Sequence, residues 1–400
     1  MKYSIKYLLF SGLFALFVFP VHADEDGKNM FNPLTTGVTT LGIAPDARGG
    51  SMGDLGVATD PDVNSQYWNP SKYAFAYSSA GVSVSYTPWL RKLVNDINLA
   101  YVAGYWKFGG NDLQALSASL RYFSLGSVPT YDNNGVLQNT VNPYEMAIDL
   151  GYSRKLSSSF SMGVVFRFIY SDMGFGGLSS AEDMSGYQTV YPIIGRSECQ
   201  FSWGFNISNI GSKVSYDGGT NSSFLPTNLR LGFSFLFPIY DYNTLSINFD
   251  ANKLLVPAAP RQSDYTYEDE YGNTQYDTEA YNRAKDKFNN TGSISGIFKS
   301  FSDAPGGFKE ELREIYFSTG LEYSYNRRFF VRAGYYYENK YKGNRQYATF
   351  GAGFSLNVFS LDAAYVLATA QSSPLDQTMR FTLSFDMDGI KDLIGRKRRR

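Results

Sequence analysis

Apolar side chains alternate with small or polar ones along most of this sequence, in segments of roughly eight to twelve residues. In 227–237, for example, Leu229, Leu231 and Phe233 are separated by Arg230 and Gly232. Successive side chains of a strand point to opposite faces, so this period of two predicts strands with one apolar and one polar face. Such strands are typical of outer-membrane barrels.

The number of these segments can be tested against the rules of barrel construction. The pattern occurs near 81–87, 97–107, 113–123, 143–153, 160–170, 199–209, 227–237, 244–252, 314–325, 329–338, 347–356, 359–367 and 378–386. Bacterial barrels have an even number of strands, with short turns at the periplasmic side and long loops outside. A further strand at 187–194 meets both conditions. We therefore predict an all-β fold, a transmembrane outer-membrane barrel of about fourteen antiparallel strands over 81–386.

A soluble β-sandwich is the main structural alternative, because its strands also alternate. Its polar faces would meet water and should be rich in Lys and Glu. Here the polar positions hold mainly Ser, Gly, Asn and Thr with scattered charges. That composition favours a crowded barrel interior.

The N-terminus resembles a secretory signal peptide over 1–23. Lys2 and Lys6 precede an apolar run over 8–19 that ends in Val-His-Ala, which predicts cleavage between Ala23 and Asp24. The run is too short for a membrane-spanning helix, which needs about twenty apolar residues. Because position 24 is not cysteine, we expect no lipid attachment there.

Composition excludes several kinds of chemistry. The only histidine, His22, leaves with the signal peptide, and Cys199 is the only cysteine. We therefore expect no histidine-based catalytic pair, no metal site, no cofactor and no intramolecular disulfide. A lipid-modifying enzyme lacks its base for the same reason. Losing Lys2 and Lys6 takes the formal charge from −1 to −3, so we also expect no nucleic-acid partner.

Two ends of the chain do not fit the strand pattern. The segment 24–80 is predicted to be a hatch or plug inside the barrel, and its motif residues are Arg48, Gly49, Gly50, Gly53, Trp68, Asn69 and Pro70. Its glycines lack the Gly-Lys-Ser/Thr of a phosphate loop. The segment 387–400, which ends in the basic run 396–400, is predicted to be a solvated periplasmic tail.

A long outer loop is predicted at 254–312, rich in tyrosine and acidic residues. Loops of this length usually have a function, and exposed aromatic side chains favour contact with a partner. The candidate contact residues are Tyr265, Tyr267, Tyr271, Tyr276, Ile294, Ile297, Phe298 and Phe301. The other predicted outer loops are 124–142, 171–186 and 210–226.

Ten charged residues are predicted to point into the lumen, namely Glu145, Asp149, Asp250, Glu322, Asp362, Arg121, Arg167, Arg230, Arg332 and Arg380. Five acids against five bases favour a bracing network, because unpaired charge in a narrow interior is costly. A carboxylate pair for acid–base chemistry and a selectivity lining for a pore are the alternatives.

Several motifs carry a family resemblance. The Ala-Arg-Gly-Gly-Ser-Met-Gly run at 47–53 and the Tyr-Trp-Asn-Pro run at 67–70 resemble the long-chain fatty-acid transporters, barrels with an N-terminal hatch. The blocks at 207–213, 224–232, 302–308, 331–335 and 342–345 are more specifically similar to the PorV family, outer-membrane barrels of the type IX secretion system.

This resemblance implies a shuttle that uses no cofactor and has no catalytic residue. It would bind secreted cargo proteins through their C-terminal β-domain, receive them from the translocon barrel and deliver them to a cell-surface attachment complex, in contact with membrane lipid. The alternative is an outer-membrane transporter of hydrophobic small molecules such as long-chain fatty acids, which the mostly polar inward positions disfavour.

Overall fold

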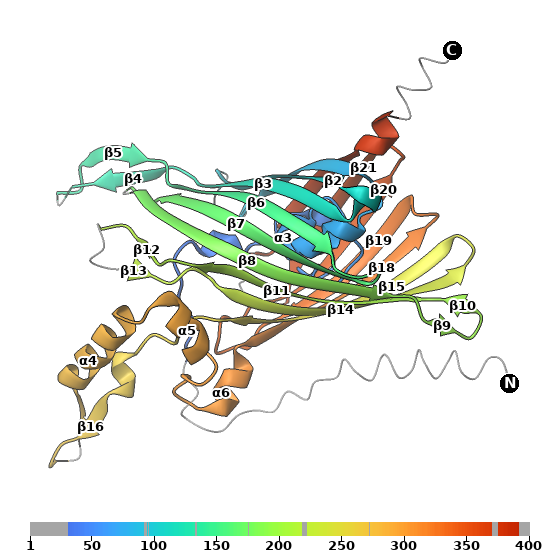
Figure 1. Cartoon of the computed structure of the whole chain (residues 1–400). Helices are drawn as coiled ribbons and strands as arrows, with labels where there is room; N and C mark the ends of the chain where they lie inside the picture. The colour runs from blue at the N-terminus through green and yellow to red at the C-terminus, as the bar shows by residue number, and fades with distance from the viewer. Residues whose placement is uncertain are drawn as a thin grey trace.

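The computed structural model describes residues 31–91, 94, 96–132, 134–174, 176–217, 222–271, 273–369 and 375–391. The predicted signal peptide with Ala23 and Asp24, and most of the predicted basic tail, lie outside these residues. Fourteen antiparallel strands close into one barrel (Figure 1). They are β1 Ala80–Pro88, β2 Ile97–Phe108, β3 Gln114–Leu125, β6 Tyr144–Lys155, β7 Phe160–Asp172, β8 Gly176–Val190, β11 Gln200–Gly211, β14 Asn228–Tyr240, β15 Asn243–Leu254, β18 Ile315–Tyr325, β19 Phe329–Tyr337, β20 Gln346–Ser355, β21 Phe359–Ala368 and β22 Met379–Asp386. β1 pairs with β22, which closes the cylinder.

The predicted strand count is confirmed, but one predicted position is wrong. The strand expected at 187–194 is β8, Gly176–Val190, so most of the predicted loop 171–186 belongs to the wall. The alternation is hard to see there because the outward positions include the polar Ser180 and Glu182. Residues 193–198 instead form a small hairpin of β9 Ile193–Ile194 and β10 Ser197–Glu198.

The two faces of the wall follow the predicted alternation. On β6, Ile148 and Leu150 are exposed on the outside of the barrel, whereas Glu145 and Asp149 are buried inside. An exposed apolar face is stable here because hydrocarbon is its solvent. Tyr122, Tyr144 and Tyr170 stack in a row along β3, β6 and β7, as in an aromatic girdle.

The two ends of the barrel differ in the length of their connections. One end has tight turns, such as 326–328 between β18 and β19, and the other has the long loops (Figure 1). The long loops contain three small hairpins, β4 Val128–Tyr131 with β5 Leu137–Val141, β12 Val214–Ser215 with β13 Ser222–Ser223, and β16 Thr266–Glu268 with β17 Thr274–Tyr276. Segment 255–314 also contains η4 Gln262–Asp264, α4 Thr278–Asn289, α5 Ser293–Lys299 and α6 Phe308–Arg313.

The N-terminal segment folds against the inner faces of the strands as a set of short helical turns (Figure 1). These are η1 Thr39–Gly42, α2 Ala47–Gly50, α3 Ser65–Trp68 and η2 Pro70–Phe75. Met52, Leu55 and Tyr73 in this segment are almost completely buried. In the part of the chain that the structure describes, no helix combines the length and the apolar character needed to cross a membrane.

Candidate functional site: the lumen and the outer face

Short capping bonds organise the glycine motif of the N-terminal segment. Asp46 caps α2 by accepting from the Gly49 amide at 2.8 Å, and it also accepts from the Trp68 indole nitrogen at 2.7 Å. A side chain at Gly49 would lie 2.4 Å from the Trp68 ring, so this contact needs glycine. Burial raises the pKa of the Asp46 carboxyl to about 6.

The Trp-Asn-Pro motif forms the next turn. Asn69 caps η2, and Pro70 occupies the first position of that helix, where no amide hydrogen is needed. The Asn69 side-chain amide donates to the carbonyls of Val57 at 3.0 Å and Gly186 at 2.9 Å. One motif residue thus ties two parts of the N-terminal segment to strand β8.

Side chains of the wall hold the same segment at several points. Arg48 pairs with Glu322 of β18 at 3.0 Å, and it also bonds Asp62 at 2.9 Å. Asp250 of β15 accepts from the amides of Gly56 and Val57.

Two further glycines of the motif approach the wall closely. Gly53 has a φ of +80° and donates to Thr349 at 2.8 Å, and a side chain there would lie 2.7 Å from the Tyr335 carbonyl oxygen. A side chain at Gly50 would collide with Arg380.

All ten charged residues predicted to face the lumen are buried. Arg167 pairs with Asp149 at 2.7 Å, and Arg332 pairs with Glu322 and with Asp362, each at 2.6 Å. This arrangement supports the bracing interpretation, because a buried charge is tolerated when it is paired and hydrogen-bonded. Asp183 is a further member that sequence reasoning missed, since it lies on the strand that was misplaced; it is 3.1 Å from Arg167.

Other wall charges bind the N-terminal segment instead of each other. Arg121 donates to the carbonyls of Thr40 at 2.6 Å and Ile43 at 2.5 Å, and Glu145 accepts from the Thr40 hydroxyl. Arg230 lies over the Tyr67 ring and donates to its hydroxyl at 3.0 Å. The wall and the segment therefore satisfy each other's polar groups.

Two cavities lie toward the two ends of the barrel. The outer one, of about 760 Å³, is lined by aromatic rings including Trp68, Tyr316 and Tyr336, and by charged groups including Arg230 and Arg345. The inner one, of about 330 Å³, is lined largely by polar and charged residues of the segment and of the opposite strand ends. The outer lining also contains aliphatic side chains such as Leu34, Ile43 and Leu254, so it combines apolar and charged groups.

An ionic cluster fixes the base of segment 255–314 at the outer mouth. The Lys253 ammonium lies 3.0 Å from Glu311 and 2.5 Å from Glu314, and Lys342 lies 2.5 Å from Glu310 and 3.1 Å from Glu314. The cluster joins β15, α6 and the β19–β20 loop. Sequence reasoning missed it, because its members come from three separate segments.

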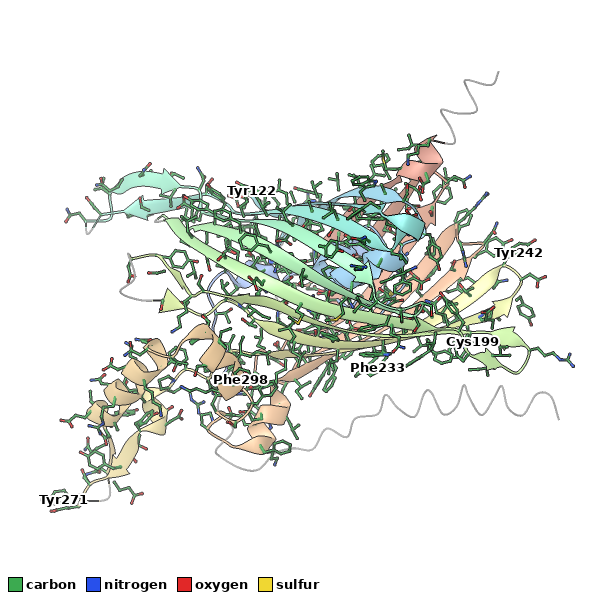
Figure 2. All side chains as sticks on the ribbon, viewed as in Figure 1. Tyr122, Cys199, Phe233, Tyr242, Tyr271 and Phe298 are labelled. Atoms are coloured by element: carbon green, nitrogen blue, oxygen red, sulfur yellow. The ribbon has the colours of Figure 1, made fainter. Side chains whose placement is uncertain are left out.

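Beyond this base, segment 255–314 projects from the barrel with aromatic side chains exposed. Tyr271 is 88% exposed at the tip of the β16–β17 hairpin, and Phe298 is 74% exposed on α5 (Figure 2). Of the eight candidate contact residues, six are exposed, namely Tyr267, Tyr271, Tyr276, Ile294, Phe298 and Phe301. The other two, Tyr265 and Ile297, are half-buried, and Tyr265 packs on Tyr281 of α4.

The described residues contain no cluster of three or more His, Cys, Asp or Glu side chains that could hold a metal ion. Cys199 is buried near the end of the barrel with the tight turns (Figure 2).

Comparisons with known proteins point to a secretion family. Residues 25–261 match the family model described as type IX secretion system protein PorV. Among solved structures, the toluene transporter TbuX of Ralstonia pickettii is 11% identical with a TM-score of 0.44, over 86% of this chain and 97% of that one. A FadL homologue of Pseudomonas aeruginosa is 12% identical with a TM-score of 0.43, over 89% of this chain and 99% of that one. No curated protein matches the sequence.

Proposed function

The chain belongs to the PorV family of type IX secretion system proteins and lies in the bacterial outer membrane, and from this premise we propose that it is a cargo shuttle. It would bind secreted proteins by their C-terminal β-domain, accept them from the translocon barrel and hand them to a cell-surface attachment complex. The binding surface would be the outer loops, with segment 255–314 as its main element.

The observation that carries this proposal is the contrast between a lumen whose N-terminal segment is bonded to the wall and an outer face with exposed aromatic side chains. The N-terminal segment is bonded to the wall through Arg48, Asp250 and Gly53, which favours a plug that stays in place. The exposed aromatic side chains lie on the projecting segment, where a partner can cover them. We therefore expect the barrel to bind its cargo through the outer loops.

The first test is affinity capture of the tagged barrel from its native outer membrane in mild detergent, followed by mass spectrometry of retained proteins and lipids. In the test variant a short Gly-Ser linker replaces 262–300, and in the control variant the same linker replaces 193–198 at the opposite end. We expect secreted proteins that share a C-terminal β-domain to be retained by the parent and the control and lost from the test variant.

The alternative transporter function gives a different result in the same experiment. Retention of fatty acids or other apolar small molecules, without secreted proteins, would contradict the shuttle. If the 262–300 variant retains as much cargo as the parent, the projecting segment is not part of the binding surface.

Single substitutions sharpen the test. Tyr271→Ala and Phe298→Ala each remove an exposed aromatic ring from the projecting segment, and we expect both to reduce cargo retention. Tyr242→Ala is the matched control, because Tyr242 is 62% exposed at a turn of the opposite end (Figure 2).

A further inference from the structure

Two hairpins on the outer face have the same tip. The sequences 132–138 and 269–275 both place Gly three residues and Gln six residues after an initial Asp. Asp132 accepts from the amides of residues 134 and 136, both at 2.9 Å, and from the side chain of Gln138 at 3.2 Å. Asp269 accepts from the amides of residues 271 and 273, at 3.0 and 2.8 Å, and from Gln275 at 3.2 Å.

These bonds link the described residues of the two tips in the same way. In each tip the Asp amide also donates to the carbonyl four residues later. The backbone donors hold the pKa of the Asp132 and Asp269 carboxyls below the ordinary value. An isolated two-stranded hairpin is only marginally stable. The hydrogen bonds of the Asp side chain at each tip therefore stabilise these short hairpins.

Both hairpins stand apart from the barrel sheet and expose their edges. β4–β5 and β16–β17 are separate two-stranded sheets that project from the same end of the barrel (Figure 1). In the β16–β17 hairpin the Asp269 amide donates to the Asn273 carbonyl, and the Asp277 amide donates to the Tyr265 carbonyl. These two bonds show which residue pairs across the hairpin are hydrogen-bonded. Because bonded and non-bonded pairs alternate, the main-chain groups of Thr274 and Tyr276 point away from β16.

The four edges are not equivalent. β4 contains Pro129, which lacks an amide hydrogen, and β16 contains the charged Glu268. Proline, charge and β-bulges are among the features that prevent an edge from pairing with another chain. β5, Leu137–Val141, contains a bulge opposite Thr130 and Tyr131, and its Thr140 amide already donates to the Asn139 side chain at 2.8 Å. β17, Thr-Gln-Tyr, has none of these features, so it is the open edge of the two hairpins.

We propose that β17 is a docking edge, which accepts an extended segment of a cargo's C-terminal β-domain by main-chain pairing. An open edge presents alternating donors and acceptors, and another strand is the complement of that array. Main-chain pairing does not depend on side-chain identity, so recognition would tolerate variation in cargo sequence. This inference rests on the proposed shuttle function and names its mode of contact.

The test compares two substitutions at one residue of the full barrel in detergent. Thr274→Pro removes an amide that points to the free edge, and Thr274→Ala removes the same side chain but keeps that amide. The probe is the isolated C-terminal domain of the most abundant secreted protein retained by the parent barrel. We expect about tenfold weaker binding for Thr274→Pro and little change for Thr274→Ala, as the loss of one or two hydrogen bonds predicts.

Hydrogen exchange supplies a second measurement that does not depend on a substitution. Binding of the domain should slow exchange at the amides of 274 and 276. Equal affinities of the two Thr274 variants, or bound domain without slowed exchange at these amides, would overturn the proposal while leaving the shuttle intact. No binding by the parent barrel would instead contradict the shuttle itself.

Discussion

Charged side chains in the lumen are buried and paired, whereas several aromatic side chains on the projecting segment 255–314 are exposed. Inside the barrel, charged groups such as Arg167 and Arg332 are buried and paired. The Gly56 amide of the N-terminal segment donates to the Asp250 carboxylate of the wall. On the projecting segment, Tyr271 and Phe298 remain exposed. The first region pairs its charged groups with one another and with the N-terminal segment, whereas the second leaves contact area for another molecule. Substitutions should therefore separate stability from binding.

The largest effect is expected from breaking the lumen network at its centre. Arg332→Met would leave Glu322 and Asp362 buried with one partner fewer. We expect a loss of about 3 kcal/mol in the free energy of unfolding, because an uncompensated buried charge is costly. Urea titration in lipid or detergent measures this. Adding Asp362→Asn should restore part of the loss, and an unchanged midpoint for Arg332→Met would contradict the bracing role.

A somewhat smaller effect is expected where the wall holds the N-terminal segment. Asp250→Ala leaves the amides of Gly56 and Val57 without their acceptor, at a cost of about 2 kcal/mol. Asp250→Asn keeps one acceptor oxygen and should cost less. If the segment is a fixed plug, the alanine variant should also conduct more ions in a planar bilayer than the parent. Equal conductance would weaken that assignment.

The pH dependence of the segment should be measurable but modest. Burial raises the pKa of Asp46 to about 6, so the folded protein binds this proton more tightly than the unfolded chain. The contribution of Asp46 to stability therefore increases as the pH falls from 7 to 5, by about 1 kcal/mol. Asp46→Asn removes the titration. The test measures the free energy of unfolding against pH for the parent and for Asp46→Asn. The difference between the two curves should not change between pH 7 and 5 if Asp46 keeps its ordinary pKa.

The smallest effect on stability is expected on the projecting segment. The double substitution of Ile294→Ser and Phe298→Ser changes two exposed side chains of α5 and should alter the free energy of unfolding by less than about 0.5 kcal/mol. Cargo retention should nevertheless fall. The helix α5 lies against β11, so a large loss of stability would show that these two side chains contribute to that packing and would erase the contrast between the two regions.

Sequence alternation located thirteen strands and the faces of their charged residues, since each strand carries its own period of two. It failed at β8, where Ser180 and Glu182 occupy outward positions and the apolar signal disappears. The exposed aromatic residues of the projecting segment could also be proposed in advance, because a long loop has little room to bury them. Tyr265 is half-buried because it packs on Tyr281, and Ile297 is half-buried on α5, a helix that lies against β11; the sequence shows neither contact.

The sequence by itself determined the class of this protein, because strand alternation and turn positions are local properties of the chain. The tertiary structure alone decided which charges meet. Arg48 reaches Glu322 across 274 positions, and Lys253 meets Glu311 and Glu314 only because β15 and β18 are neighbours in the wall. Ion pairs depend on strand register and on closure of the barrel, and no single segment of the sequence determines either.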